Sequence, residues 1–223
     1  MESVLPFLRD ISNEEIAFEQ PTADNREELL NYMCDEFGQD EPLIQSLAAT
    51  REEIAPLLLS WINVALSQSY TYVVRTKQNG KLIGCALNGV GSVQEVCALN
   101  EHAMSEKALK VMKIMNEVKQ PLLRIGRDRK CMEIIALSVA NGYHGRGIGK
   151  ALVSLSLDLA RKSGCRMVAS EATAFGSQKI FSYFHFETLY EIMLNEYLED
   201  GKVVFPVKAG TTKSALLACK SLN

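Results

Sequence analysis

The stretch from residue 131 to residue 163 changes abruptly from an apolar run to a glycine-rich turn and then to a helical pattern. The run "CMEIIALSVA" (131–140) is almost continuously apolar, which is typical of a strand buried on both faces. The turn "HGRGIG" (144–149) has glycine at every second position, and the apolar spacing that follows predicts a helix over 148–163. This order of strand, glycine turn and helix favours an α/β fold with an anion site where the helix begins.

The glycine turn restricts which phosphate-binding motif this site uses. A Walker A loop is excluded because Ala151 follows Gly149-Lys150 and His144 stands where the first glycine is required. A dinucleotide fingerprint starting at Gly145 is excluded because its third glycine falls at Lys150. A helix start without any ligand is the alternative, but each glycine there costs roughly 0.5–1 kcal/mol relative to alanine. The turn therefore predicts a bound phosphate or pyrophosphate.

The other segments alternate between strand-like and helix-like patterns, so we expect one α/β domain over residues 1–223. A capping box of Thr50 and Glu53 opens one helix, Pro42 opens a short helical stretch inside the loop 38–47, and Asn79-Gly80 predicts a two-residue hairpin turn. Strands are expected at 16–20, 69–76, 81–90, 165–172 and 187–194, helices at 24–37, 105–119 and 175–184, and a closing hairpin from 201–205 and 213–222.

Charge and cysteine usage exclude several classes of protein. The net charge of -3 gives no basic field for nucleic acid. The six cysteines form no C-x-x-C pair and the three histidines do not cluster with them, so we expect no metal site and a reduced, cytoplasmic protein. The first residues, "MESVLPFLRD", lack the pattern of a signal peptide, and no apolar run approaches a membrane span.

The turn "HGRGIG" resembles the pyrophosphate loop [QR]-x-x-G-x-[GA] of the GNAT superfamily of N-acetyltransferases, with His144 in place of Gln or Arg. The segments after it, ending in "FHFETLY", follow the same family order, although His185 stands where a glycine is usual. The resemblance implies a mixed, mostly antiparallel central sheet that is splayed in the middle and flanked by helices. It also implies acetyl-CoA as cosubstrate, bound by Leu137, Ser138, Val139, His144, Gly145, Arg146, Gly147, Ile148, Gly149, Lys150 and Ser177.

Two further segments, "DEPL" (40–43) and "GKVVFPV" (201–207), look like the insect-type arylalkylamine N-acetyltransferases. This narrower resemblance implies acetylation of a small arylalkylamine such as dopamine, serotonin or tyramine. It also implies that Glu41 is the general base, because an alkylammonium must lose a proton before it attacks. A solvated loop carboxylate before Pro42 is the alternative interpretation of Glu41.

The departing thiol and the thioester oxygen set two further requirements. Backbone amides at Leu137–Val139 are expected to stabilise the charge on the oxygen. The tyrosine slot of many GNAT enzymes holds Phe181, but Thr173 and Ser177 align with two hydroxyls of the insect-type subfamily, and their i, i+4 spacing predicts a shared helix face. Ser177 is a candidate to contact the coenzyme sulfur, with a helix-start cap as the alternative.

Two other functions remain open from the sequence. The carboxylates Asp35, Glu36, Asp40 and Glu41 suit a polycationic acceptor, so polyamine or protein acetylation is one alternative. A non-catalytic acyl-CoA sensor is the other, since His144 and the missing tyrosine depart from the family pattern. In each case we expect a monomer or weak dimer with no nucleic-acid or membrane partner.

Overall fold

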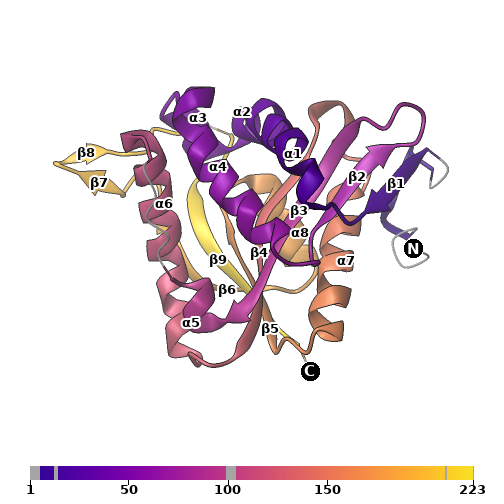
Figure 1. Cartoon of the computed structure of the whole chain (residues 1–223). Helices are drawn as coiled ribbons and strands as arrows, with labels where there is room; N and C mark the ends of the chain where they lie inside the picture. The colour runs from indigo at the N-terminus through magenta and orange to yellow at the C-terminus, as the bar shows by residue number, and fades with distance from the viewer. Residues whose placement is uncertain (1–5, 13–14, 99–103, 209, 223) are drawn as a thin grey trace.

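The computed structural model describes residues 6–12, 15–98, 104–208 and 210–222. A seven-stranded sheet in the order β1-β2-β3-β4-β5-β9-β6 crosses the molecule, and helices cover both of its faces (Figure 1). The strands of this sheet are β1 Ile16–Glu19, β2 Tyr72–Thr76, β3 Leu82–Ser92, β4 Lys130–Val139, β5 Met167–Ala172, β6 Glu187–Met193 and β9 Ser214–Ser221. A separate hairpin consists of β7 Leu198–Glu199 and β8 Lys202–Val203.

Two pairs of helices form the outer layers. α4 and α6 pack on each other over one face of the sheet, and α7 and α8 pack on each other over the opposite face (Figure 1). The helical segments are η2 Ala23–Asn25, α1 Arg26–Tyr32, the π-helix η3 Met33–Phe37, α2 Gly38–Asp40, α3 Pro42–Ser46, α4 Arg51–Leu66, α5 Val93–Val96, α6 Glu106–Lys119, η4 Gln120–Arg124, η5 Asn141–Tyr143, α7 Ile148–Lys162 and α8 Phe175–Tyr183.

The middle of the sheet is the feature that creates the site. β4 pairs with β5 in parallel only where Cys131–Glu133 faces Met167–Ala169. A side-chain bond from the Ser170 hydroxyl to the Ile134 carbonyl (2.8 Å) follows, and the strands then separate. β3 stays paired with β4, and β9 with β5, in antiparallel register. The sheet is therefore mixed, mostly antiparallel and splayed in the middle, as predicted.

Local signals place most of the elements correctly, with boundaries that move by a few residues. The capping box of α4 is present: the Glu53 amide donates to Thr50 Oγ1 (3.4 Å), and the Thr50 amide donates to Glu53 Oε2 (2.7 Å). The apolar run of β4 is buried on both faces through most of its length. All six cysteines are free and buried, consistent with their placement in apolar runs.

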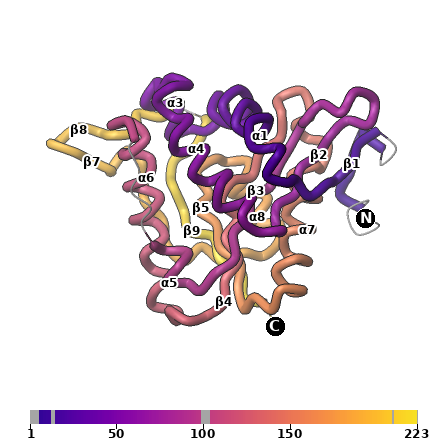
Figure 2. The backbone as a smooth tube through the Cα atoms, in the orientation of Figure 1, coloured from indigo at the N-terminus to yellow at the C-terminus, as the bar shows by residue number. Residues whose placement is uncertain are grey.

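Three expected elements are wrong. β9 does not pair with β8: it lies between β5 and β6 in the sheet, and β8 pairs with β7 instead. Figure 2 shows the β7–β8 hairpin apart from β9. The reason is burial, because β9 is apolar on both faces and only a position inside the sheet covers both. Residues 38–40 continue the π-helix as α2 rather than starting a loop. The hairpin turn after β2 is longer than two residues, since Thr76 and Lys81 close it with the bond Thr76 N to Lys81 O (2.9 Å).

Two further expectations concern a signal peptide at the start of the chain and helices that could span a membrane. Residues 1–5, which belong to the segment tested for a signal peptide, lie outside the described residues. Within the described ranges, every helix is too short or too polar to cross a lipid bilayer.

Candidate active site

A cavity of about 720 Å³ opens where β4 and β5 separate, a volume within the usual range for small-molecule sites. One side of it is formed by the end of β4, the start of α7 and the start of α8. The other side is formed by residues of α4, α6 and the segment before α3. Its lining includes Phe7, Phe37, Glu41, Trp61, Met115, Ile135, Val139, His144, Gly147, Glu171, Thr173 and Ser177.

The start of α7 presents free backbone amides to this cavity. Gly147 is the N-cap, with a left-handed φ of 84°, and Gly145 has a φ of 78°. The first bond of the helix runs from Ala151 N to Gly147 O (3.0 Å), so the amides of 148–150 precede the helical ladder. A Cβ at Gly149 would lie 2.8 Å from Ile180 Cδ1, so a larger residue there requires the Ile180 side chain to shift. This arrangement is a cradle for an anion such as a diphosphate.

Nearly all residues predicted to bind the coenzyme line this cavity. Arg146 is the exception, since its guanidinium stacks 5.2 Å from the centre of the Tyr143 ring. The residues of the set that do line the cavity are Leu137, Ser138, Val139, His144, Gly145, Gly147, Ile148, Gly149, Lys150 and Ser177. The glycine cradle, the cavity volume and these lining residues fit a coenzyme with an anionic diphosphate.

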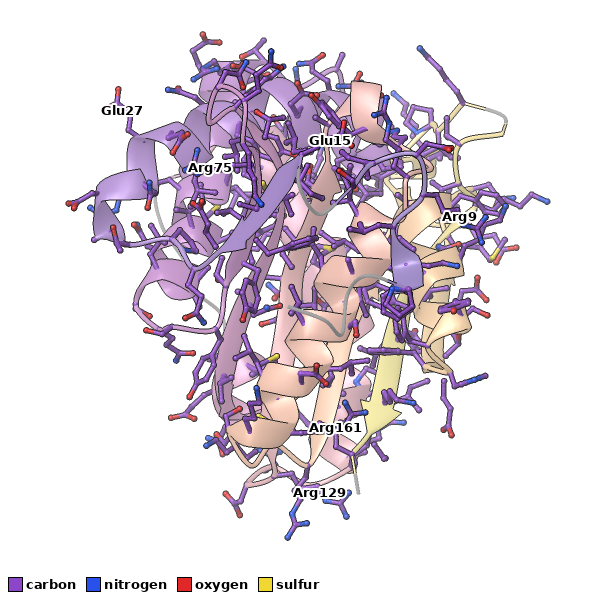
Figure 3. All side chains as sticks on the ribbon, turned by 90° about the vertical axis from the view of Figure 1, so that its right-hand side faces the viewer. Arg9, Glu15, Glu27, Arg75, Arg129 and Arg161 are labelled. Carbon is purple, nitrogen blue, oxygen red and sulfur yellow. The ribbon has the colours of Figure 1, made fainter. Side chains whose placement is uncertain are left out.

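The N-terminal segment lies directly on the glycine turn, which the sequence did not indicate. The Arg9 amide donates to the Arg146 carbonyl (2.9 Å), and the Phe7 ring packs against Phe184 at 5.5 Å between ring centres. A Cβ on Gly147 would lie 1.6 Å from the Phe7 carbonyl oxygen, so glycine is required here for space as well as for φ. Figure 3 shows Arg9 in this segment, at the end of the molecule opposite Arg161 of α7. The string "PFLRD" carries no pattern that would have predicted this contact.

His144 has a defined contact in place of the usual family residue. Its Nε2 lies 2.6 Å from the Val139 carbonyl oxygen and 3.9 Å from Asp40 Oδ2. Asn141 Nδ2 donates to Asp40 Oδ1 (3.3 Å). These bonds connect the glycine turn to the last residue of β4 and to the segment just before Glu41.

Glu41 is buried, with 5% of its surface exposed. It is the N-cap of α3, and its Oε2 accepts a bond from the Ile44 amide (2.7 Å). Its Oε1 has no hydrogen-bond partner among the described residues. Burial raises the pKa of this carboxyl, and the Ile44 amide and the Thr173 hydroxyl offset part of that rise. The alternative interpretation of Glu41 as a solvated loop carboxylate is therefore wrong.

Thr173 and Ser177 both line the cavity, but not for the reason that their spacing suggested. Thr173 precedes the N-cap Ala174, so it lies outside α8 and shares no helix face with Ser177. The Ser177 hydroxyl donates to the Ala174 carbonyl (2.8 Å) within the first turn, so Ser177 does not cap the helix. Phe181 is buried, and Lys150 Nζ lies 3.5 Å from the centre of the Tyr183 ring at the cavity edge.

The wall on the α4 and α6 side is apolar. Phe37 and Trp61 meet edge to face, with ring centres 6.1 Å apart, and Val111, Met115 and Ile135 complete the wall.

A sheet splayed between two parallel strands, with a glycine cradle at the helix after the first of them, is the architecture of an acyltransferase. The chain belongs to the acetyltransferase (GNAT) family, whose model matches residues 27–186. Among curated protein sequences, none matches the chain closely enough to carry an inference.

Solved structures agree with this family assignment. Arylalkylamine N-acetyltransferase 2 from Aedes aegypti is 27% identical, with a TM-score of 0.82, over 95% of this chain and 100% of that one. The putative arylalkylamine N-acetyltransferase 7 from the same mosquito is 19% identical, with a TM-score of 0.79, over 93% and 88%. A Drosophila melanogaster polyamine N-acetyltransferase is 16% identical, with a TM-score of 0.71, over 93% and 100%. The last two show the fold alone.

Proposed function

We propose that this protein transfers an acetyl group from acetyl-CoA to the nitrogen of a small arylalkylamine such as dopamine, serotonin or tyramine. The observation that carries the proposal is the buried carboxyl of Glu41, which has one unpartnered oxygen and lines the same cavity as the glycine cradle. The free cysteines support a reducing, cytoplasmic location.

The start of α7 would hold the diphosphate of the coenzyme. The amides of 148–150 and the positive end of the helix dipole favour this group, and Gly145 and Gly147 keep side chains out of its way. Acetyl-CoA supplies a thioester as the acyl donor. The open edge of β4 at Leu137–Val139 offers backbone groups to the arm of the coenzyme and to the charge that develops on the thioester oxygen.

Glu41 acts as the general base in this proposal. Its raised pKa brings the carboxyl closer to the working pH, where a base accepts a proton most effectively. It takes the proton from the ammonium group, directly or through water, and leaves a neutral amine. The neutral amine then attacks the thioester carbon directly, without a covalent enzyme intermediate, and the coenzyme leaves as its thiolate as the amide bond forms.

Thr173 and Ser177 are the hydroxyls proposed to assist the departing thiol. Both line the cavity beside the start of α8. The Ser177 hydroxyl donates to the Ala174 carbonyl, so it has to rotate out of that bond before it can donate to the departing thiolate. The Thr173 hydroxyl also lowers the pKa of the Glu41 carboxyl, which supports a role for Thr173 in passing a proton between Glu41 and the reacting groups.

The walls of the acceptor side favour an aromatic amine over a polycation. Phe37 and Trp61 offer ring faces and edges to an aromatic ring. The outer carboxylates have local partners: Asp35 pairs with Arg51 (2.5 Å), and Glu36 accepts the Asn141 amide (3.3 Å). They therefore offer less attraction to a spermidine-like acceptor than their number suggests.

A substrate panel tests the proposal. The full chain is incubated with acetyl-CoA and, in turn, dopamine, serotonin, tyramine, spermidine and a histone-tail peptide, and thiol release is followed. We expect the three arylalkylamines to give the highest kcat/KM. Preference for spermidine or the peptide would overturn the choice of acceptor. Coenzyme binding without turnover on any amine would favour a sensor.

A further inference from the structure

The cavity contains a second buried carboxyl that the proposed mechanism does not use. Glu171 is on β5, two residues past the last residue that pairs with β4. Its side chain is 1% exposed, and its Oε1 has no hydrogen-bond partner among the described residues. Because β4 and β5 begin to separate just before this point, Glu171 is among the residues that line the cavity.

Two other charged residues surround Glu171. Lys119 of α6 forms an ion pair with Glu133 of β4, and its Nζ lies 3.8 Å from Glu171 Oε2. One cation thus serves two carboxyls, and Glu133 has the closer contact. Burial, with Glu133 nearby, raises the pKa of Glu171 to about 8, although Lys119 opposes this rise. The raised pKa favours the protonated form of the Glu171 carboxyl in the folded protein.

Glu171 and Glu41 line the same cavity, and Thr173, which influences the pKa of Glu41, lies two residues after Glu171, just past the end of β5. An acceptor whose nitrogen is held at Glu41 therefore lies in a cavity that also presents the Glu171 carboxyl. Trp61, Met115 and Ile135 provide apolar contacts for an aromatic ring of that acceptor.

We propose that Glu171 is a specificity residue that hydrogen-bonds a ring hydroxyl of the acceptor, so that the site prefers phenolic arylalkylamines to their unsubstituted counterparts. This inference rests on the proposed function. A hydroxyl bonds a carboxyl in either protonation state, whereas a second ammonium group requires Glu171 to lose its proton first. A ring hydroxyl also satisfies the orphan oxygen, and a site built around a hydroxyl rejects an analogue that lacks it.

The test compares matched substrates on matched variants. Tyramine is compared with phenethylamine, and serotonin with tryptamine, on the wild type and on Glu171→Leu, which leaves the Lys119–Glu133 pair intact. We expect the hydroxylated amine to have the higher kcat/KM in the wild type, and Glu171→Leu to reduce that preference about tenfold. Glu171→Leu should still acetylate phenethylamine. If Glu171 had only a structural role, its replacement would lower the activity on both amines alike.

Two further variants serve as controls. Glu171→Gln keeps hydrogen-bonding capacity and should keep part of the preference. Glu133→Gln alters the same cluster at a residue that does not line this cavity, and should keep the full preference. Hexylamine and hexamethylenediamine form an additional substrate pair. A loss of diamine preference in Glu171→Leu, with the phenol preference intact, would overturn the inference.

The outcomes separate this inference from the proposed function. A wild type that acetylates arylalkylamines equally with and without the hydroxyl would overturn the role of Glu171 and leave the proposed function standing. A wild type that acetylates none of them would overturn both.

Discussion

The Nε2 atom of His144 lies 2.6 Å from the carbonyl oxygen of Val139, which closes the glycine turn onto the last residue of β4. The same imidazole lies 3.9 Å from Asp40, the residue before Glu41. A histidine at this position therefore connects the expected coenzyme loop to the segment that carries the expected base. We therefore expect the conformation of the glycine turn and the position of Glu41 both to depend on the His144 side chain.

Replacing His144 tests this connection. His144→Ala should weaken acetyl-CoA binding about three- to tenfold, because the loss of one hydrogen bond costs roughly 0.5–1.5 kcal/mol. The melting temperature should change little, since the imidazole is 52% exposed. Isothermal calorimetry measures the affinity, and His185→Asn, at an exposed residue with a φ of 57°, is the control. Equal affinity in wild type and His144→Ala would show that this contact does not support the loop.

Glu41→Gln should lower kcat by about 100- to 10,000-fold, the range expected for loss of a general base. In the wild type the rate should rise with pH as the carboxyl ionises through its raised pKa, and this acidic limb should be absent in the variant. Glu27→Gln, on the exposed side chain labelled in Figure 3, is the charge-matched control. A pH–rate profile measures both effects, and an unchanged acidic limb in Glu41→Gln would assign the base to another residue.

Glu171 makes a separate prediction about stability. Its pKa is raised from an ordinary acidic value to about 8, so the folded state holds a proton that the unfolded state releases. The free energy of unfolding should therefore fall as pH rises from about 4.5 to 8, by an amount on the order of 1 kcal/mol or more. Glu171→Gln should remove this dependence and gain stability relative to the wild type above pH 8. Melting curves across this range test it, and parallel pH profiles for the two proteins would contradict it.

Gly147→Ala should lower the stability of the protein for two reasons. The left-handed φ of 84° disfavours any Cβ, and the Phe7 carbonyl oxygen would lie 1.6 Å from it. We expect a loss of about 1–3 kcal/mol in stability and weaker acetyl-CoA binding. Gly142→Ala has no atom within 4 Å of the new Cβ and serves as the control. Denaturant titration measures the stability. If both variants unfold at the same denaturant concentration, the Phe7 contact is not formed in solution.

Trp61→Ala should raise the KM for arylalkylamines about tenfold and leave the Kd for acetyl-CoA unchanged. The indole lines the acceptor wall and packs edge to face on Phe37, so its removal loses contact with the acceptor ring. Val64→Ala, a partly exposed residue one turn further along α4 and outside this cavity, is the control. A parallel loss of coenzyme affinity would instead indicate a general disruption of the site.

The parts of the fold predicted from the sequence are those with local causes. The apolar run of β4, the glycine turn and the helix α7 follow one another within thirty-odd residues, and the capping box of α4 depends on Thr50 and Glu53 alone. The pairing of β9 was not predictable in this way. Its neighbours in the sheet, β5 and β6, are distant segments, and only their combined apolar faces decide where β9 is buried.

The same distinction between local and tertiary causes applies to the candidate site. The sequence alone predicted the glycine turn at the start of α7, because glycines at 145, 147 and 149 act through local backbone conformation. Tertiary structure alone decided that Glu41 and Glu171 lose contact with water, and that Phe7 covers Gly147. The reason is physical: backbone conformation is set by neighbours in the chain, whereas burial and the pKa of a carboxyl are set by groups that only folding brings near.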